Sequence, residues 1–235
     1  MVITATKNQR GYMHIEINAA TVAFLEFCSQ TKVVADIGAA YGVATIPALE
    51  AGANVIACDI STEHIQVIEK ETPKQFLENL KTIIGKFPYI EFENKSIDGV
   101  LLSHVLPFLN GEEMEIAAKV LFDCLKSGGK IFIYGYTPFV GFLDNFLPVY
   151  EERKKNNVLF PSYIENFHEY SEITEYNSKL PQTLHPIDLD VLQNIFSANG
   201  FTTEKAEYLD GTDLNIHPEL ISKGKECAVF IARKK

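Results

Sequence analysis

The sequence predicts an α/β protein with helices on both faces of a doubly wound parallel sheet. Short apolar segments that suit buried strands alternate with segments whose apolar residues recur at helical spacing. Elements that alternate in this way form βαβ units, which build a parallel sheet. A glycine-bearing turn joins the first strand to the next helix at residues 38–42. The chain of 235 residues is long enough to bury the core of one such domain.

Each expected strand is a short apolar segment, and each expected helix has an apolar face or a capping residue. The strands are residues 33–35, 53–59, 81–87, 97–103, 130–136, 202–209 and 226–232. The helices are residues 15–29, 43–50, 62–72, 112–125 and 186–199, and the third could also continue after a kink to about residue 80. Residues 1–14 are expected to form an irregular arm, and residues 126–129 a stop for the fourth helix.

The turn after the first strand has the residues of a ligand-binding loop. Asp36 stands at the end of that strand, Gly38 and Gly42 follow, and a helix begins directly behind them. Such a strand–turn–helix unit aims backbone N–H groups at a ligand. Because a carboxylate at the head of the turn would repel a pyrophosphate, Asp36 favours a ligand with positive charge and hydroxyls. S-adenosylmethionine, which carries an ammonium and a sulfonium, fits this description.

A segment rich in aromatic residues interrupts the alternation of strands and helices. Together with Tyr136, residues 137–186 hold ten of the chain's aromatic residues, which number 10 Tyr and 16 Phe. Two sets recur at helical spacing: Phe139, Phe142, Phe146 and Tyr150, then Phe160, Tyr163, Phe167 and Tyr170. We name residues 137–186 the aromatic insertion and predict a helical lid over a binding site. The alternative is that both sets are ordinary core.

Composition and charge disfavour several kinds of partner. A net charge of −10 and a pI near 5.1 argue against nucleic acid. The sequence shows no signal peptide and no apolar run of the roughly 18–20 residues that a membrane span needs. The four cysteines stand far apart, as is typical of core residues in a reducing cytoplasm, and the histidines lack metal-ligand spacing. We expect a cytoplasmic protein without a bound metal.

These motifs together resemble the class I S-adenosylmethionine-dependent methyltransferases of the small-molecule type. Residues 36–42 match the family's first motif, acid-x-Gly-x-Gly-x-Gly, with Ala40 in place of the middle glycine. Asp59 matches the acid at the end of the second strand. Residues 98–109 are similar to the fourth-strand motif, and residues 125–130 to the turn into the fifth strand.

The resemblance implies both a fold and a reaction. The fold is a single Rossmann-like domain over residues 1–235, whose seven strands lie in the order 3-2-1-4-5-7-6 with the last one antiparallel. The reaction is methyl transfer to an oxygen, nitrogen or carbon atom of a small or amphipathic acceptor, with S-adenosylhomocysteine as product. A nicotinamide oxidoreductase is disfavoured because residues 38–42 do not supply Gly-x-Gly-x-x-Gly. The other alternative is a catalytically silent S-adenosylmethionine-binding or interaction protein.

The resemblance also implies which residues bind the cofactor. Asp36 and the loop Gly38-Ala39-Ala40-Tyr41-Gly42 would hold its amino-acid end, and Asp59 would accept both ribose hydroxyls. Ile60 would pack on the adenine. Lys86 and Phe87 stand where the family usually carries an acid for the adenine amino group, so backbone groups and Phe87 would bind the adenine instead.

Three further residues are assigned to the methyl-transfer side. Ser103 and His104 follow the fourth strand, where ligands of open α/β sheets bind. Ser103 would contact the cofactor through its backbone, and His104 would act as a general base or would only pack on the cofactor. Tyr12, in the arm, would cover the sulfonium or be a structural tyrosine. His64, one turn into the helix after Asp59, is expected to be solvated.

Overall fold

The structure is a computed structural model that describes residues 3–5, 12–14, 17–29, 32–171, 181–212 and 220–235. Its strands are β1 (Ile3–Ala5), β2 (Tyr12–His14), β3 (Val33–Ile37), β4 (Asn54–Asp59), β5 (Leu80–Ile84), β6 (Ile97–Ser103), β7 (Leu125–Tyr136), β8 (Phe201–Leu209) and β9 (Cys227–Lys234). Its α-helices are α1 (Ala19–Phe27), α2 (Thr45–Glu50), α3 (Thr62–Glu71), α4 (Gly111–Cys124), α5 (Leu147–Lys155) and α7 (Leu189–Ala198). Short 3-10 helices are η1 (Lys74–Asn79), η2 (Leu106–Phe108), η3 (Gly141–Leu143) and η4 (Phe167–Glu169).

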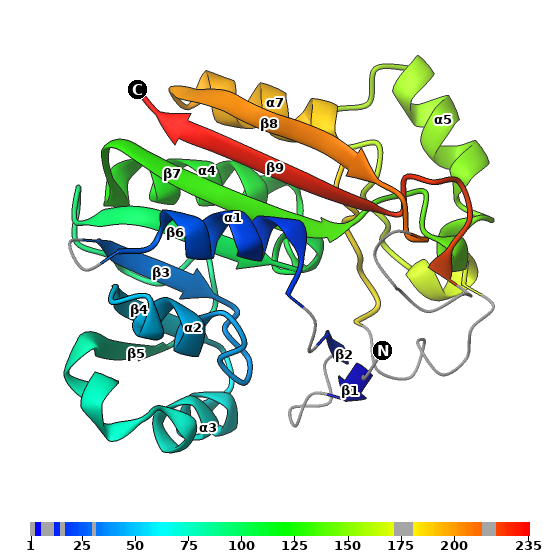
Figure 1. The fold of residues 1–235 in the computed structure, drawn as a ribbon. Coiled ribbons are helices and arrows are strands. Elements are labelled where there is room, and N and C mark those ends of the chain that lie inside the picture. The colour runs from blue at the N-terminus through cyan, green and yellow to red at the C-terminus, as the bar shows by residue number, and fades with distance from the viewer. Residues whose placement is uncertain (1–2, 6–11, 15–16, 30–31, 172–180, 213–219) are drawn as a thin grey trace.

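Seven strands form one mixed sheet in the order β5-β4-β3-β6-β7-β9-β8 (Figure 1). Counted from β3, this order is 3-2-1-4-5-7-6, and β9 is antiparallel to both of its neighbours. The fold that the resemblance implied is therefore confirmed. The chain order reverses between β3 and β6, and open α/β sheets bind ligands at such a reversal, outside the carboxyl ends of the strands.

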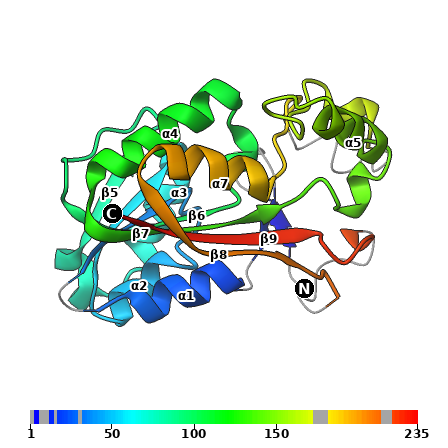
Figure 2. The ribbon, with the colours of Figure 1, turned by 90° about the horizontal axis from the view of Figure 1, so that it is seen from above.

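Helices cover both faces of the sheet, as the alternation of β7 side chains requires. Ile131 and Ile133 pack in the cluster that includes α4 and α7, whereas Phe132 and Tyr134 pack with α1 and α2. Figure 2 shows α4 and α7 on one side of the strands and α1 and α2 on the other. The four cysteines are buried free thiols. Within the described ranges, no helix has the length and apolar character to cross a membrane.

The aromatic insertion has a hydrophobic cluster of its own. Its buried members are Val140, Phe142, Leu143, Phe146, Tyr150, Ile164, Phe167 and Leu184, joined by Leu220 from the β8–β9 connection. In Figure 1, α5 lies beyond the ends of β7 and β9. The first aromatic set is partly helical, since Phe142 lies in η3 and Tyr150 in α5.

The prediction that residues 160–170 form a helix is wrong. Only Phe167–Glu169 are helical there, and Ile164 forms an antiparallel bridge with Leu184. Pro161 explains part of the difference, because proline disfavours the helical conformation in the residue before it and lacks an N–H donor.

The structure corrects three other expectations. Residues 3–5 and 12–14 of the arm pair as antiparallel strands β1 and β2, so the arm is not wholly irregular. The first helix begins at Ala19, after an N-cap by Asn18, and residues 15–16 lie outside the described residues. Residues 126–129 belong to β7 rather than to a separate stop, because Leu125 already pairs with Ile97 of β6.

Candidate active site

The loop between β3 and α2 turns sharply because three of its residues have positive φ. These are Gly38 at 73°, Ala40 at 46° and Gly42 at 80°. Ala40 takes the left-handed conformation although it carries a Cβ, which is unfavourable by about 1 kcal/mol. A Cβ at Gly38 would lie only 2.6 Å from Cγ2 of Val105. The loop therefore touches the segment that follows β6, and only glycine fits at Gly38.

Most of the backbone N–H groups of this loop are used inside the protein. Gly38 and Ala39 donate to the carbonyl oxygen of Cys58, at 2.8 and 3.0 Å. Ala40 donates to Oδ2 of Asp59 at 2.9 Å, and Gly42 donates to Ala39 at 2.8 Å. The expectation that the turn presents these N–H groups to a ligand is wrong for these four residues. Those of Gly38, Ala39 and Ala40 fasten the loop to the end of β4 instead, and that of Gly42 closes a turn within the loop.

Asp36 provides a buried carboxylate beneath the loop. Its side chain is 3% exposed, and Oδ2 accepts a hydrogen bond of 2.7 Å from the Thr45 hydroxyl. Burial raises the pKa of Asp36 to about 6, and the nearby Asp59 carboxylate adds to this, against the opposing hydrogen bond from Thr45. A carboxylate in this state gains from a cationic partner such as an ammonium.

Asp59 ends β4 and is held by three hydrogen bonds. Oδ2 accepts from the Ala40 N–H, while Oδ1 accepts from the Ser61 N–H at 2.8 Å and contacts Nδ1 of His64 at 3.0 Å. Burial acts to raise the pKa of Asp59, but the hydrogen bonds from His64, Ser61 and Ala40 outweigh it and hold the pKa below its ordinary value. His64 is 2% exposed, so the expectation that it is solvated is wrong.

The residues expected near the adenine differ in how accessible they are. Ile60 follows Asp59 directly and is 46% exposed, which leaves its side chain available to a flat ring. Phe87 is 5% exposed and belongs to the main core cluster. Lys86 lies after β5, and its Nζ is 2.5 Å from Oε1 of Glu113 at the start of α4. Packing of adenine against Phe87 is therefore less favoured than packing against Ile60.

Ser103 and His104 lie where β6 ends. The Ser103 hydroxyl accepts a hydrogen bond of 2.9 Å from Asn18, the N-cap of α1. His104 has a positive φ of 57°, and its N–H donates to Tyr134 at 2.7 Å. Its ring packs against Tyr134 and Tyr136 of β7. A strained residue at the carboxyl end of a central strand is typical of a functional site.

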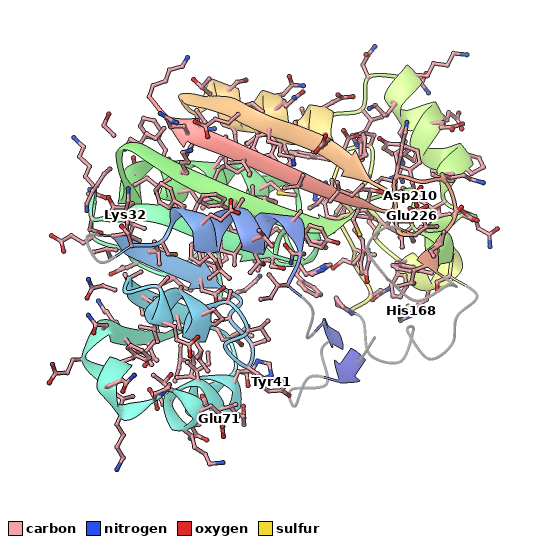
Figure 3. The ribbon with its side chains drawn as sticks, viewed as in Figure 1. Lys32, Tyr41, Glu71, His168, Asp210 and Glu226 are labelled. Atoms are coloured by element: carbon pink, nitrogen blue, oxygen red, sulfur yellow. The ribbon has the colours of Figure 1, made fainter. Side chains whose placement is uncertain are left out.

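The sheet register brings most of the predicted residues to one edge. Ile37 of β3 pairs with Cys58 of β4 and with Leu102 of β6, so the residues after these strands emerge side by side. In Figure 3, Tyr41 lies on the loop after β3, on the side of the molecule where α3 begins. Tyr12 belongs to β2, but its side chain lies outside the described residues, so the structure does not place its ring.

Three residues of this site were not expected from the sequence. Asn18 supports Ser103, His64 contacts Asp59, and Glu113 pairs with Lys86. For His64 a signal existed. Ser61 caps α3 and its hydroxyl accepts from the His64 N–H at 3.3 Å, which turns the third residue of the helix back toward the end of β4.

These residues fit S-adenosylmethionine. The buried Asp36 suits the ammonium, and Asp59 lies at the end of the neighbouring strand. Among the residues that the structure describes, no cluster of three His, Cys, Asp or Glu side chains could hold a metal ion.

Comparison with known proteins agrees with this fit. The family described as "Methyltransferase domain" matches residues 35–133, which run from β3 into β7 and include the loop, Asp59 and His104. A search of curated proteins found no significant match.

Many solved structures share the fold. An S-adenosylmethionine-dependent methyltransferase from Mesorhizobium loti has a TM-score of 0.67 at 16% identity, covering 92% of this chain and 99% of its own. Another from Methanosarcina mazei has a TM-score of 0.62 at 15% identity, with coverages of 90% and 96%. The 1,6-didemethyltoxoflavin-N1-methyltransferase of Burkholderia thailandensis, with bound 1,6-didemethyltoxoflavin and S-adenosylhomocysteine, scores 0.62 at 15% identity, with coverages of 93% and 78%. Residues 35–133 are thus similar to a methyltransferase domain, and the chain shares the fold of S-adenosylmethionine-dependent methyltransferases.

Proposed function

We propose that the chain transfers a methyl group from S-adenosylmethionine to a small or amphipathic acceptor that binds against aromatic side chains. The supporting observation is a series of neighbouring rings that we name the ring series. The centroid of the His104 ring lies 5.1 Å from Tyr134 and 4.9 Å from Tyr136. Tyr136 lies 6.3 Å from Phe142, which lies 6.2 Å from Phe167. The rings thus continue from the end of β6 into the aromatic insertion.

The ring series begins next to residues 38–42, the loop between β3 and α2, which we name the cofactor loop for the role proposed here. Gly38 contacts Val105, which directly follows His104. Aromatic faces attract a cation and exclude water from it, so rings at this place favour a sulfonium donor. They also favour an acceptor with an apolar or aromatic part. The net charge of −10 disfavours a nucleic-acid acceptor.

The cofactor supplies a methyl group that its sulfonium already activates. Asp36 would accept hydrogen bonds from the ammonium, and the loop over residues 38–42 would border the amino-acid end. Asp59 would accept from the ribose, and Ile60 would cover the adenine, with Lys86 near the adenine edge. On the far side of the sulfur, Ser103 would line the cofactor through its backbone, and Tyr12 would cover it from the arm.

Because the donor is activated, positioning of the acceptor supplies most of the catalysis. His104 is the candidate for a second role. A general base is needed only if the acceptor must lose a proton of low acidity. His104 would then take that proton, and otherwise its ring would only pack on the reacting groups.

The test is product formation with acceptors of graded polarity. The purified chain is incubated with S-adenosylmethionine and with aromatic, amphipathic or strongly hydrophilic acceptors, and S-adenosylhomocysteine is measured. We expect turnover with the first two classes. Equal turnover with hydrophilic acceptors or with an oligonucleotide would contradict the proposal.

Two variants sharpen this test. Tyr136→Leu should raise KM for the acceptor by up to about tenfold, because an aromatic contact contributes roughly 0.5–1.5 kcal/mol, and should leave the affinity for S-adenosylhomocysteine, which carries no sulfonium, unchanged. Phe122→Leu is the control, since its ring packs on Phe201 at the opposite edge of the sheet. His104→Gln separates the two roles of His104. A lower kcat with a lost acidic limb in the pH profile indicates a base, whereas a change in KM alone indicates packing.

A further inference from the structure

Asp59 has little room left for a ligand. A carboxylate offers about four lone-pair positions, two on each oxygen. On Oδ1 both are taken, by the Ser61 N–H and by Nδ1 of His64. On Oδ2 one is taken, by the Ala40 N–H. One position, on Oδ2, stays open, so a contact with two ribose hydroxyls would require one of the three partners to leave.

None of the three partners is free to leave. The N–H groups of Ala40 and Ser61 belong to the backbone, the first in the loop between β3 and α2 and the second at the N-cap of α3. His64 is 2% exposed, and its ring lies edge-on to Tyr41, with centroids 5.0 Å apart. The Ser61 cap holds the backbone of His64 in place. The burial and the ring contact oppose a rotation of the imidazole away from Asp59.

The hydrogen bonds also define the state of the imidazole. Because the ionised Asp59 carboxylate can only accept, Nδ1 of His64 carries the hydrogen. Nε2 is buried and has no hydrogen-bond partner in the described part of the chain. Burying a ring nitrogen that carries no hydrogen costs less free energy than burying an N–H group without an acceptor. We therefore expect Nε2 to carry no hydrogen.

We infer that His64 is a positioning residue that holds Asp59 with a single open acceptor position, so that Asp59 binds one ribose hydroxyl of the cofactor and not both. This inference rests on the proposed contact between Asp59 and the ribose. It replaces the two-hydroxyl contact that the sequence suggested. A family resemblance would not reveal it, because it depends on the histidine five residues after Asp59 in this chain.

The first experiment compares analogues that lack one hydroxyl. Binding of S-adenosylhomocysteine and of its 2′-deoxy and 3′-deoxy analogues is measured by titration calorimetry. We expect one analogue to bind about tenfold more weakly than the parent, which is the scale of one hydrogen bond to a charged group. The other should stay within about threefold. Equal losses for both analogues would overturn the inference.

The second experiment tests His64 itself. His64→Asn keeps an N–H donor near the place of Nδ1, whereas His64→Leu removes it. We expect His64→Leu to bind S-adenosylhomocysteine about tenfold more weakly and His64→Asn to stay close to the original chain. Equal losses in both variants would mean that His64 contributes only packing. Gln66→Leu, at an exposed position of the same helix, is the matched control, and circular dichroism and thermal unfolding check that each variant is folded.

A spectroscopic readout completes the test. The ¹⁵N resonances of His64 should show a protonated Nδ1 and a bare Nε2, both with and without S-adenosylhomocysteine. A change of tautomer on binding would mean that His64 releases Asp59, and would overturn the inference. If Asp59→Asn and both deoxy analogues bind as tightly as their parents, the proposed ribose contact fails as well, and the inference fails with it.

Discussion

The cofactor loop and the aromatic insertion are held together in opposite ways. Around the loop, hydrogen bonds join residues that are near one another along the chain. Asp59 accepts from Ser61 and Ala40, which are 2 and 19 residues away. Asp36 accepts from Thr45, which is 9 residues away.

The aromatic insertion depends on distant parts of the chain. The Tyr150 hydroxyl of α5 donates at 2.9 Å to Asp188, the N-cap of α7, which is 38 residues away. The Thr137 hydroxyl donates to the carbonyl of Lys225, which is 88 residues away. The insertion is therefore anchored to the start of α7 and to the segment that leads into β9.

This difference suits two separate tasks, the binding of the cofactor and the binding of the acceptor. A local scaffold that depends on a few φ angles suits the proposed binding of the cofactor. An insertion with its own hydrophobic cluster can change its packing without disturbing that scaffold. We therefore expect substitutions in the loop to affect the cofactor, and substitutions in the insertion to affect stability and the acceptor.

Gly38→Ala should have the largest effect. The new Cβ would meet Val105 at 2.6 Å in a residue whose φ is 73°, and strain plus clash should amount to roughly 2–4 kcal/mol. Calorimetry should show a loss of about 100-fold or more in S-adenosylhomocysteine affinity.

Two other substitutions control for backbone strain alone. Gly128→Ala also introduces a Cβ at positive φ, but nothing lies within 4 Å of it. It should lower stability by about 1 kcal/mol and leave cofactor affinity unchanged. Ala40→Gly should raise stability by at most about 1 kcal/mol, because it removes the strain at φ 46°. An affinity loss at Gly128 as large as that at Gly38 would contradict the local account of the loop.

Tyr150→Phe should have an intermediate effect. It removes the hydroxyl that donates to the buried Asp188 carboxylate, and the free energy of unfolding should fall by about 2 kcal/mol in urea denaturation. Cofactor affinity should not change. Tyr163→Phe, which removes a hydroxyl from a half-buried ring of the same insertion, should stay within about 0.5 kcal/mol. If Tyr150→Phe weakens cofactor binding as strongly as it weakens folding, the two regions are coupled and the comparison fails.

The pH dependence of cofactor binding should be the smallest effect. The pKa of Asp36 is about 6 before binding, and an ammonium partner favours the ionised carboxylate. Binding below this pH must therefore release a proton, so affinity should rise with pH up to about 7 and then level off. At pH 5 the affinity should be about tenfold weaker than at pH 7.5.

Asp36 has the opposite effect on how folding stability changes with pH. Since the pKa of Asp36 is raised from 3.8 to about 6 in the folded state, the folded chain binds this proton more tightly, and the contribution of Asp36 to stability falls as the pH rises between these values. His185, whose pKa burial lowers to about 4, titrates in the same range. Asp36→Asn therefore serves as the reference in both measurements. A pH dependence of affinity that persists in Asp36→Asn would remove Asp36 from the site.

The sequence predicted the loop well and its hydrogen bonds poorly. Gly38 and Gly42 take the positive φ that glycine adopts readily, and Asp36 and Asp59 lie at the ends of neighbouring strands as expected. That the loop N–H groups bond to β4 was not predictable, because it depends on how closely β3 and β4 approach. The burial of His64 against Asp59 was not predicted for a similar reason. Helical periodicity shows which residues share a helix face, but it does not show what packs against that face.

The sequence by itself determined the order of strands and helices along the chain, the glycine loop and the acids beside it, whereas the order of the strands in the sheet came from the family resemblance. These features depend on the turn conformation and apolar spacing of residues close together in the chain, so short patterns encode them. Only the tertiary structure decided which rings surround His104, how residues 160–170 run, and how many acceptor positions Asp59 retains. The first two depend on segments that are far apart in the chain, and the third depends on how α3 and the loop after β3 pack on the end of β4. Spacing within one segment does not predict which partner packs against it.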